Sequence, residues 1–144
     1  MKRIAILIGS PGTPYLTGVK KDIENIKTYL QSSIGGAWTS GEIKETTLNP
    51  SAKDTLSLLD NINSADFAFV YFSGHGFTGT DNKGKININT NEVINISDIA
   101  NRCKKQITII DACRGYQEYS GFDGLSEQVT FSFDTSNNEG ARMI

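Results

Sequence analysis

The sequence contains few of the residues that perform thiol and imidazole chemistry: of its 144 residues, one is a histidine and two are cysteines. It also has no long apolar run, because the longest, Phe67–Phe72, has the length of a strand and not the ~20 residues of a membrane span. The apolar stretch after Lys2 and Arg3 is too short for the core of a signal peptide and runs directly into Gly9. We therefore interpret it as a first strand and expect a cytoplasmic protein.

Charge of one sign is not in excess either. A net charge of -2 lacks the basic surplus that is typical of nucleic-acid binding, so no nucleic-acid partner is expected. The two cysteines, Cys103 and Cys113, are not expected to form a disulfide in a cytoplasmic chain. Cys103 lies in a helix-like segment and is interpreted as a small buried hydrophobic residue. The length of the chain indicates one domain.

Apolar runs and amphipathic segments alternate along the chain, which is typical of parallel strands joined by helices. The pattern predicts strands at 4–8, 43–48, 66–72 and 106–110, a weaker strand at 129–133, helices at 18–33, from Ser51 onward and at 97–103, and a half-exposed hairpin at 85–96. The expected fold class is α/β: a three-layer α/β/α sandwich with a mostly parallel sheet and a small accessory hairpin.

Two short motifs follow the third and fourth of these predicted strands. Residues 73–76 read Ser-Gly-His-Gly, and residues 111–115 read Asp-Ala-Cys-Arg-Gly. Sites in parallel sheets lie beyond the carboxyl ends of the strands. We therefore expect His75 and Cys113 on loops at one edge of the sheet, beside a third loop at 9–18.

A thiol and an imidazole at the same edge of a sheet are the minimum set for a cysteine nucleophile. A nearby imidazole lowers the pKa of a thiol and returns a proton to the leaving amine. Cys113 is therefore the predicted nucleophile, and His75 is the predicted general acid and base. A tetrahedral oxyanion needs preorganised donors, and the backbone amides of Gly76 and Cys113 are predicted to supply them.

Taken together, the two motifs resemble the catalytic motifs of the caspase/metacaspase/paracaspase clan, the peptidase C14 type. The resemblance covers residues 1–116 and implies the large-subunit core of a caspase-like cysteine endopeptidase. Asp111, two residues before Cys113, is similar to metacaspases and paracaspases, which cleave after arginine or lysine and not after aspartate. The resemblance then implies an acidic substrate-binding (S1) pocket formed by Asp22, Ser73 and Asp111.

The resemblance also implies a part that the sequence does not contain. The clan completes its sheet with a small subunit, and residues 117–144 resemble the linker or activation-loop tail that leads to it. We therefore expect a partner chain that supplies this subunit, because otherwise an apolar sheet edge would stay uncovered. The substrate would be a protein or peptide, and the implied role is that of a regulated protease in cell death or defence.

Two other interpretations remain open at this stage. A non-catalytic caspase-like interaction scaffold would keep the same fold, although the usual sign of such a scaffold is loss of the histidine or the cysteine. A flavodoxin-like or receiver-type binding domain would need a phosphate-loop fingerprint, which residues 9–12 lack.

Some metacaspases require calcium, and Asp81, Asn82 and Glu92 carry oxygen atoms that could bind it. They show no calcium-loop pattern, so no metal or other cofactor is predicted.

Overall fold

The computed structural model describes residues 1–116 and 126–132, and those from Cys113 onward by their backbone alone. The described residues form one mixed sheet of seven strands around the central strand β3. The strands are β1 (Arg3–Ser10), β2 (Ile43–Glu45), β3 (Phe67–Thr78), β4 (Gly84–Asn87), β5 (Val93–Asn95), β6 (Gln106–Tyr116) and β7 (Ser126–Ser132). The α-helices are α1 (Val19–Gln31) and α2 (Ala52–Leu59), and the short 3-10 turns are η1 (Asp60–Ser64) and η2 (Ile96–Asp98).

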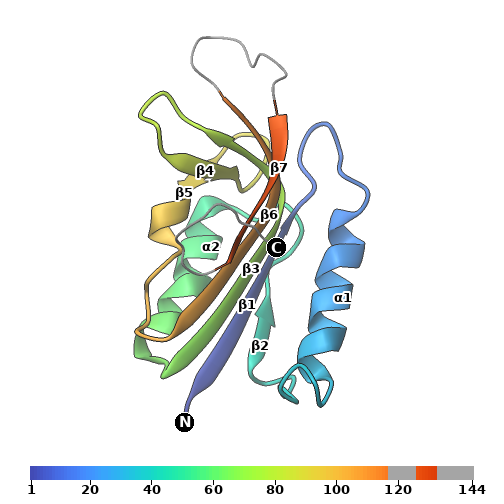
Figure 1. Cartoon of the computed structure of the whole chain (residues 1–144), viewed down its shortest axis with the longest axis vertical. Helices are drawn as coiled ribbons and strands as arrows, with labels where there is room; N and C mark the ends of the chain where they lie inside the picture. The colour runs from blue at the N-terminus through green and yellow to red at the C-terminus, as the bar shows by residue number, and fades with distance from the viewer. Residues whose placement is uncertain (117–125, 133–144) are drawn as a thin grey trace.

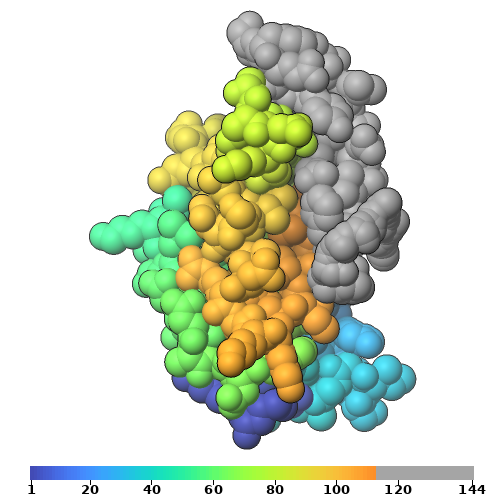
Figure 2. All heavy atoms as spheres, turned by 60° about the vertical axis from the view of Figure 1, so that its left-hand side comes forward, coloured from blue at the N-terminus to red at the C-terminus, as the bar shows by residue number. Residues whose placement is uncertain are grey.

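The core of the sheet is parallel, as expected for strands joined by helices. β1 pairs in parallel with both β2 and β3, and β3 pairs in parallel with β6. The hairpin β4–β5 is antiparallel and extends the sheet beyond the end of β1 (Figure 1). In Figure 2, the segment from η2 into β6, coloured gold to orange, lies below this hairpin on the side of the molecule that faces the viewer.

The two α-helices cover opposite faces of the sheet, which confirms the predicted three-layer sandwich (Figure 1). Successive residues of a strand point to opposite faces, so each continuous apolar run supplies both layers. On the α2 side, Ile4, Ile6, Ile8, Val70 and Phe72 pack with Leu59 of α2 and Ile62 of η1. On the α1 side, Ala5, Leu7 and Tyr71 pack with Ile23 and Leu30 of α1.

The local sequence accounts for the buried face of α1 and for the start of α2. In α1, Val19, Ile23 and Leu30 are buried, which is the stripe expected for a helix with one face on the sheet. In α2, the hydroxyl of Ser51 accepts a hydrogen bond from the amide of Asp54 at 3.0 Å, which confirms Ser51 as the N-cap.

The helix predicted at 97–103 is wrong, because only the 3-10 turn η2 forms there. Asn101 has a φ of 62°, in the left-handed region, which an α-helix cannot include. The side-chain oxygen of Gln106 then accepts from the amides of Arg102 and Cys103 at 2.8 and 3.2 Å. These contacts satisfy backbone groups that a helix would have paired internally.

The edge of the sheet beyond β6 is also different from the expectation. The sequence predicted that an apolar sheet edge would stay uncovered without a partner chain, but β7 of the same chain pairs with β6 in antiparallel fashion from Ile109↔Ser132 to Gly115↔Ser126. The weaker strand predicted at 129–133 is thus part of the sheet, and it begins three residues earlier. The tail beyond this strand lies outside the described residues.

Candidate active site

The two motifs lie inside strands and not on the predicted loops. β3 continues past Phe72 to Thr78, and β6 continues past Ile110 to Tyr116, with the two strands paired throughout. Extended backbone persists because β4 supplies a new neighbour for β3 where β1 ends. Both motifs therefore lie on paired strands of the sheet.

His75 occupies the point where β3 exchanges one neighbour for another. The register of β1 with β3 ends at the pair Ser10↔Gly74, and that of β4 with β3 begins at Gly76↔Ile86. On this side of β3, His75 is therefore the one residue between the two pairings. This point lies just beyond the carboxyl end of β1, and α/β proteins place their sites beyond the carboxyl ends of parallel strands.

The loop that leaves β1 holds the imidazole of His75. The ring atom Nε2 lies 2.8 Å from the carbonyl oxygen of Pro14. A carbonyl only accepts, so this contact assigns the ring proton to Nε2 and leaves Nδ1 as the acceptor. Gly12 makes the approach feasible, because it has a φ of +63° and a Cβ there would lie 2.7 Å from His75 Cδ2.

The segment that contains Asn49 holds this loop in place through hydrogen bonds. The amide of Gly12 donates to the side-chain oxygen of Asn49 at 2.9 Å, and the amide of Asn49 donates to the carbonyl of Gly9 at 3.0 Å. The turn of the hairpin adds a contact between the hydroxyls of Thr13 and Thr90 at 3.0 Å. The sequence predicted a loop at 9–18 beside the motifs, but it did not predict the contacts of this loop with Asn49 and Thr90, since these join segments far apart in the chain.

Cys113 on β6 is paired directly with His75 on the adjacent strand β3. The parallel register of β3 with β6 pairs their Cα atoms, and adjacent strands are about 4.8 Å apart. The sequence predicted that these two residues would reach the same edge. The backbone register brings them opposite each other.

Of the three residues predicted to form an acidic pocket, Ser73 and Asp111 lie two positions before His75 and Cys113 on the same strands, and Asp22 lies on α1. Ser73 is the register partner of Asp111, and its hydroxyl donates to Asp22 Oδ2 on α1 at 2.9 Å. A fourth residue, Tyr71, joins them: its hydroxyl donates to Asp111 Oδ2 at 3.1 Å. Tyr71 was not among the residues predicted from the sequence, although its position two residues before Ser73 puts both side chains on one face of β3.

The charges of both carboxylates affect the pKa of Tyr71. Burial of the ring, followed by the negative charges of Asp111 and Asp22, raises the pKa of Tyr71 far above its usual range. The hydroxyl therefore stays neutral and keeps its proton through alkaline pH. The same dependence on two charges indicates that both carboxylates share one environment.

Gly76, predicted to offer an oxyanion donor, lies buried between β4 and β6. Its register partners are Ile86 on one side and Arg114 on the other. With Cys113 at the next position along β6, the two backbone amides named by the sequence belong to neighbouring positions of paired strands.

Two of the residues considered for calcium, Asp81 and Glu92, have protein partners. Asp81 accepts from the ammonium of Lys85 and from the amide of Lys83, each at 3.1 Å, and the Lys85 contact holds the pKa of Asp81 below its usual range. Glu92 accepts from the amide of Ala52 at 2.9 Å, which lowers the pKa of its carboxyl. In the part of the chain that the structure describes, no group of three or more His, Cys, Asp or Glu side chains is placed to hold a metal ion.

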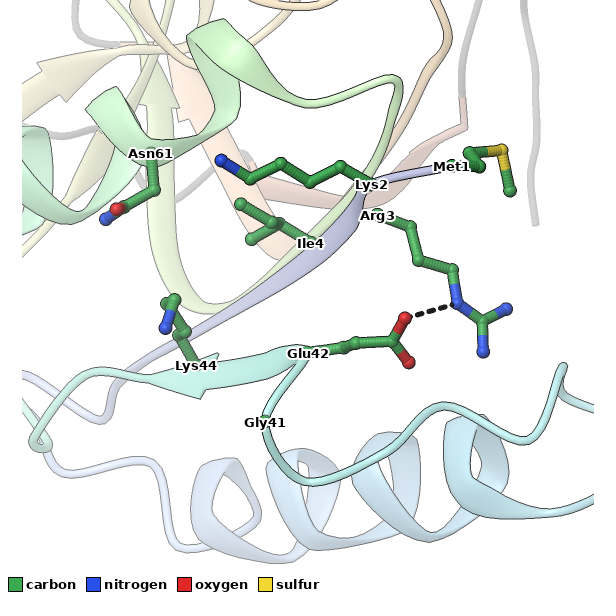
Figure 3. Close-up of a pocket in the computed structure, with 8 residues that line it drawn as sticks. All are labelled: Met1, Lys2, Arg3, Ile4, Gly41, Glu42, Lys44 and Asn61. Carbon is green, nitrogen blue, oxygen red and sulfur yellow. Dashed lines mark hydrogen bonds and ion pairs between the residues drawn. The ribbon is translucent and has the colours of Figure 1, made fainter.

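A hollow of about 380 Å³ lies at the opposite end of the sheet, where β1 and β2 begin (Figure 3). Arg3 and Glu42, which both line it, form an ion pair at 2.9 Å, and the guanidinium lowers the pKa of the Glu42 carboxyl. Lys2 reaches the hydroxyl of Ser64 at 3.0 Å. The hollow is lined by Met1, Lys2, Arg3, Ile4, Gly41, Glu42, Lys44 and Asn61, none of which belongs to the two motifs.

Comparison with known families agrees with the geometry. A family model described as a caspase domain, of the peptidase C14 type, matches residues 2–141. No curated protein matches the sequence significantly. Neither helix of the described residues has the length and apolar composition needed to cross a membrane.

Proposed function

The chain belongs to the caspase-domain family, and from that premise we propose that it is a cysteine endopeptidase that cleaves after arginine or lysine. The observation that carries the proposal is the register of β3 with β6, which pairs His75 with Cys113 and Ser73 with Asp111. One strand pair thus juxtaposes the residue types for nucleophilic attack and those for binding a cation.

In the proposed mechanism, His75 removes the proton from the thiol of Cys113 and the thiolate attacks the scissile carbonyl carbon. The contact of Nε2 with Pro14 leaves Nδ1 to accept that proton. The backbone amides of Gly76 and Cys113 stabilise the oxyanion. The imidazolium then protonates the leaving amine, and water hydrolyses the thioester to release the acid and the free thiol.

The proposed specificity rests on the two carboxylates of Asp22 and Asp111. Each is held by a neutral hydroxyl, from Ser73 and Tyr71 respectively, and these two bonds leave the negative charges in place. A guanidinium binds carboxylates through short, charge-assisted and often bidentate hydrogen bonds. A substrate aspartate would instead face like charges, which costs several kcal/mol.

A panel of fluorogenic peptides that differ only at the residue before the scissile bond tests the specificity. We expect kcat/KM for the arginine peptide to exceed that for the aspartate peptide roughly a hundredfold or more, with lysine between them. Asp22→Asn and Asp111→Asn are expected to narrow the difference. Faster turnover of the aspartate peptide would refute the basic specificity while leaving the peptidase assignment intact.

The family resemblance supports two further proposals about context. We propose that the active enzyme includes a small subunit, supplied by a partner chain, that completes the substrate-binding walls. We also propose a regulated role in cell death or defence, in a reducing cytoplasmic compartment that keeps the catalytic cysteine as a thiol. Assaying the panel with and without the candidate partner chain tests the first of these.

A further inference from the structure

Two hydroxyls on one face of β3 each hold a different carboxylate. Ser73 donates to Asp22 at 2.9 Å, and Tyr71 donates to Asp111 at 3.1 Å. The residues are two apart on a strand, so their side chains leave the sheet on the same side. Each of these two acidic residues therefore accepts a hydrogen bond from a hydroxyl on β3.

The ring of Tyr71 has little freedom to move. Its residue exposure is 4%, and it belongs to the apolar cluster between the sheet and α1, with Leu7 and Ile23. The terminal torsion of an aspartate side chain is broad, so an unanchored carboxylate samples many orientations. A donor on a rigid, buried ring restricts that sampling for Asp111.

The hydroxyl of Tyr71 is also a permanent donor. Its pKa is raised by burial and by the charges of Asp111 and Asp22, so it keeps its proton throughout the neutral and alkaline range. A cationic donor at this position would neutralise the carboxylate that it orients. A neutral donor does not.

We propose that Tyr71 is a positioning residue for specificity, which sets the orientation of the Asp111 carboxylate so that it binds a guanidinium. The inference rests on the proposed function, since it assigns Tyr71 a role in the same acidic site. It goes beyond the two motifs, because Tyr71 belongs to neither of them.

Ligand binding tests this role separately from catalysis. The Cys113→Ala chain is titrated with acetylarginine amide and with the neutral isostere acetylcitrulline amide, followed by NMR. We expect Tyr71→Phe to weaken binding of the arginine ligand about tenfold and to leave the citrulline ligand unchanged, because only the charged ligand needs the oriented carboxylate. Tyr29→Phe, at an exposed position of α1, is the matched control and is expected to change neither affinity.

A double-mutant cycle distinguishes positioning from packing. If Tyr71 acts through Asp111, adding Tyr71→Phe to Asp111→Asn changes the arginine affinity by less than about twofold. The same tenfold loss in both backgrounds would overturn the inference, and so would an unchanged affinity in Tyr71→Phe. It would also be overturned if the Cys113→Ala chain, with Tyr71 and Asp111 intact, did not prefer the arginine ligand over the citrulline ligand. Thermal midpoints of all variants separate loss of fold from loss of binding.

The result is distinguishable from a failure of the proposed function. Absence of peptide hydrolysis even when the partner chain is present, together with the expected binding pattern, would refute the peptidase and support the role of Tyr71. Hydrolysis after arginine together with a silent Tyr71→Phe would support the peptidase and refute that role.

Discussion

Cys113→Ala is expected to lower kcat/KM for an arginine peptide about ten-thousandfold, to the residual rate that binding and oxyanion stabilisation alone provide. His75→Ala is expected to cause a loss of about a thousandfold or more, because without the imidazole the thiol is mostly protonated and the leaving amine receives no proton. Both follow from the register that pairs these two residues across β3 and β6. Initial rates with the fluorogenic peptide measure the losses.

The chain offers a matched control for the cysteine. Cys103 is partly buried, and its thiol lies 3.2 Å from the carbonyl oxygen of Ala65, far from the motifs in the fold. Cys103→Ala is expected to retain activity while losing some packing. Equal losses in Cys103→Ala and Cys113→Ala, or full activity in Cys113→Ala, would contradict the assigned nucleophile.

The histidine has a chemical readout of its own. His75 is the sole histidine, so any imidazole effect on the thiol must come from it. The rate at which iodoacetamide alkylates Cys113 near pH 6 is expected to fall in His75→Ala, because a thiol without an imidazole neighbour has little thiolate at that pH. An unchanged alkylation rate would show that His75 does not activate the thiol of Cys113.

The layers of the fold were predictable because hydrophobic periodicity is a local signal. The apolar run at Ile4–Ile8 and the apolar stripe of α1 each predict from local sequence which residues are buried, and the structure confirms both predictions. The failures arise where one residue overrides the local pattern. The left-handed backbone of Asn101 ends a segment that otherwise reads as a helix.

The residues of the site likewise divide into those that the sequence identifies and those that only the fold reveals. Motif residues such as His75 stand out because their residue types are scarce in the sequence. Pro14, Asn49 and Tyr71 do not stand out, since an ordinary carbonyl, amide or hydroxyl gains its importance only through a contact with a distant residue. The register that aligns the motifs is likewise a property of the sheet, because it depends on how β3 and β6 pair along their whole length.

Gly12→Ala is the substitution outside the two motifs from which we expect the largest effect. A Cβ at Gly12 would lie 2.7 Å from Cδ2 of His75, closer than carbon atoms approach without a shift. The backbone there has a φ of +63°, which costs a residue with a Cβ about 1–2 kcal/mol. Either the imidazole moves or the loop that carries Pro14 moves, and both displace the ring from its carbonyl acceptor.

A misplacement of about 1 Å at a catalytic group costs roughly a hundredfold in rate, so we expect kcat/KM of Gly12→Ala to fall by about that factor. The free energy of unfolding, measured by denaturant titration, should fall only by the backbone cost. Gly18→Ala is the matched control: it makes the same chemical change at the other end of the same loop, where φ is -81° and no atom lies within 4 Å of the added Cβ. If Gly12→Ala were as active as Gly18→Ala, the loop would not hold the catalytic histidine, and the contact between His75 and Pro14 would have no part in catalysis.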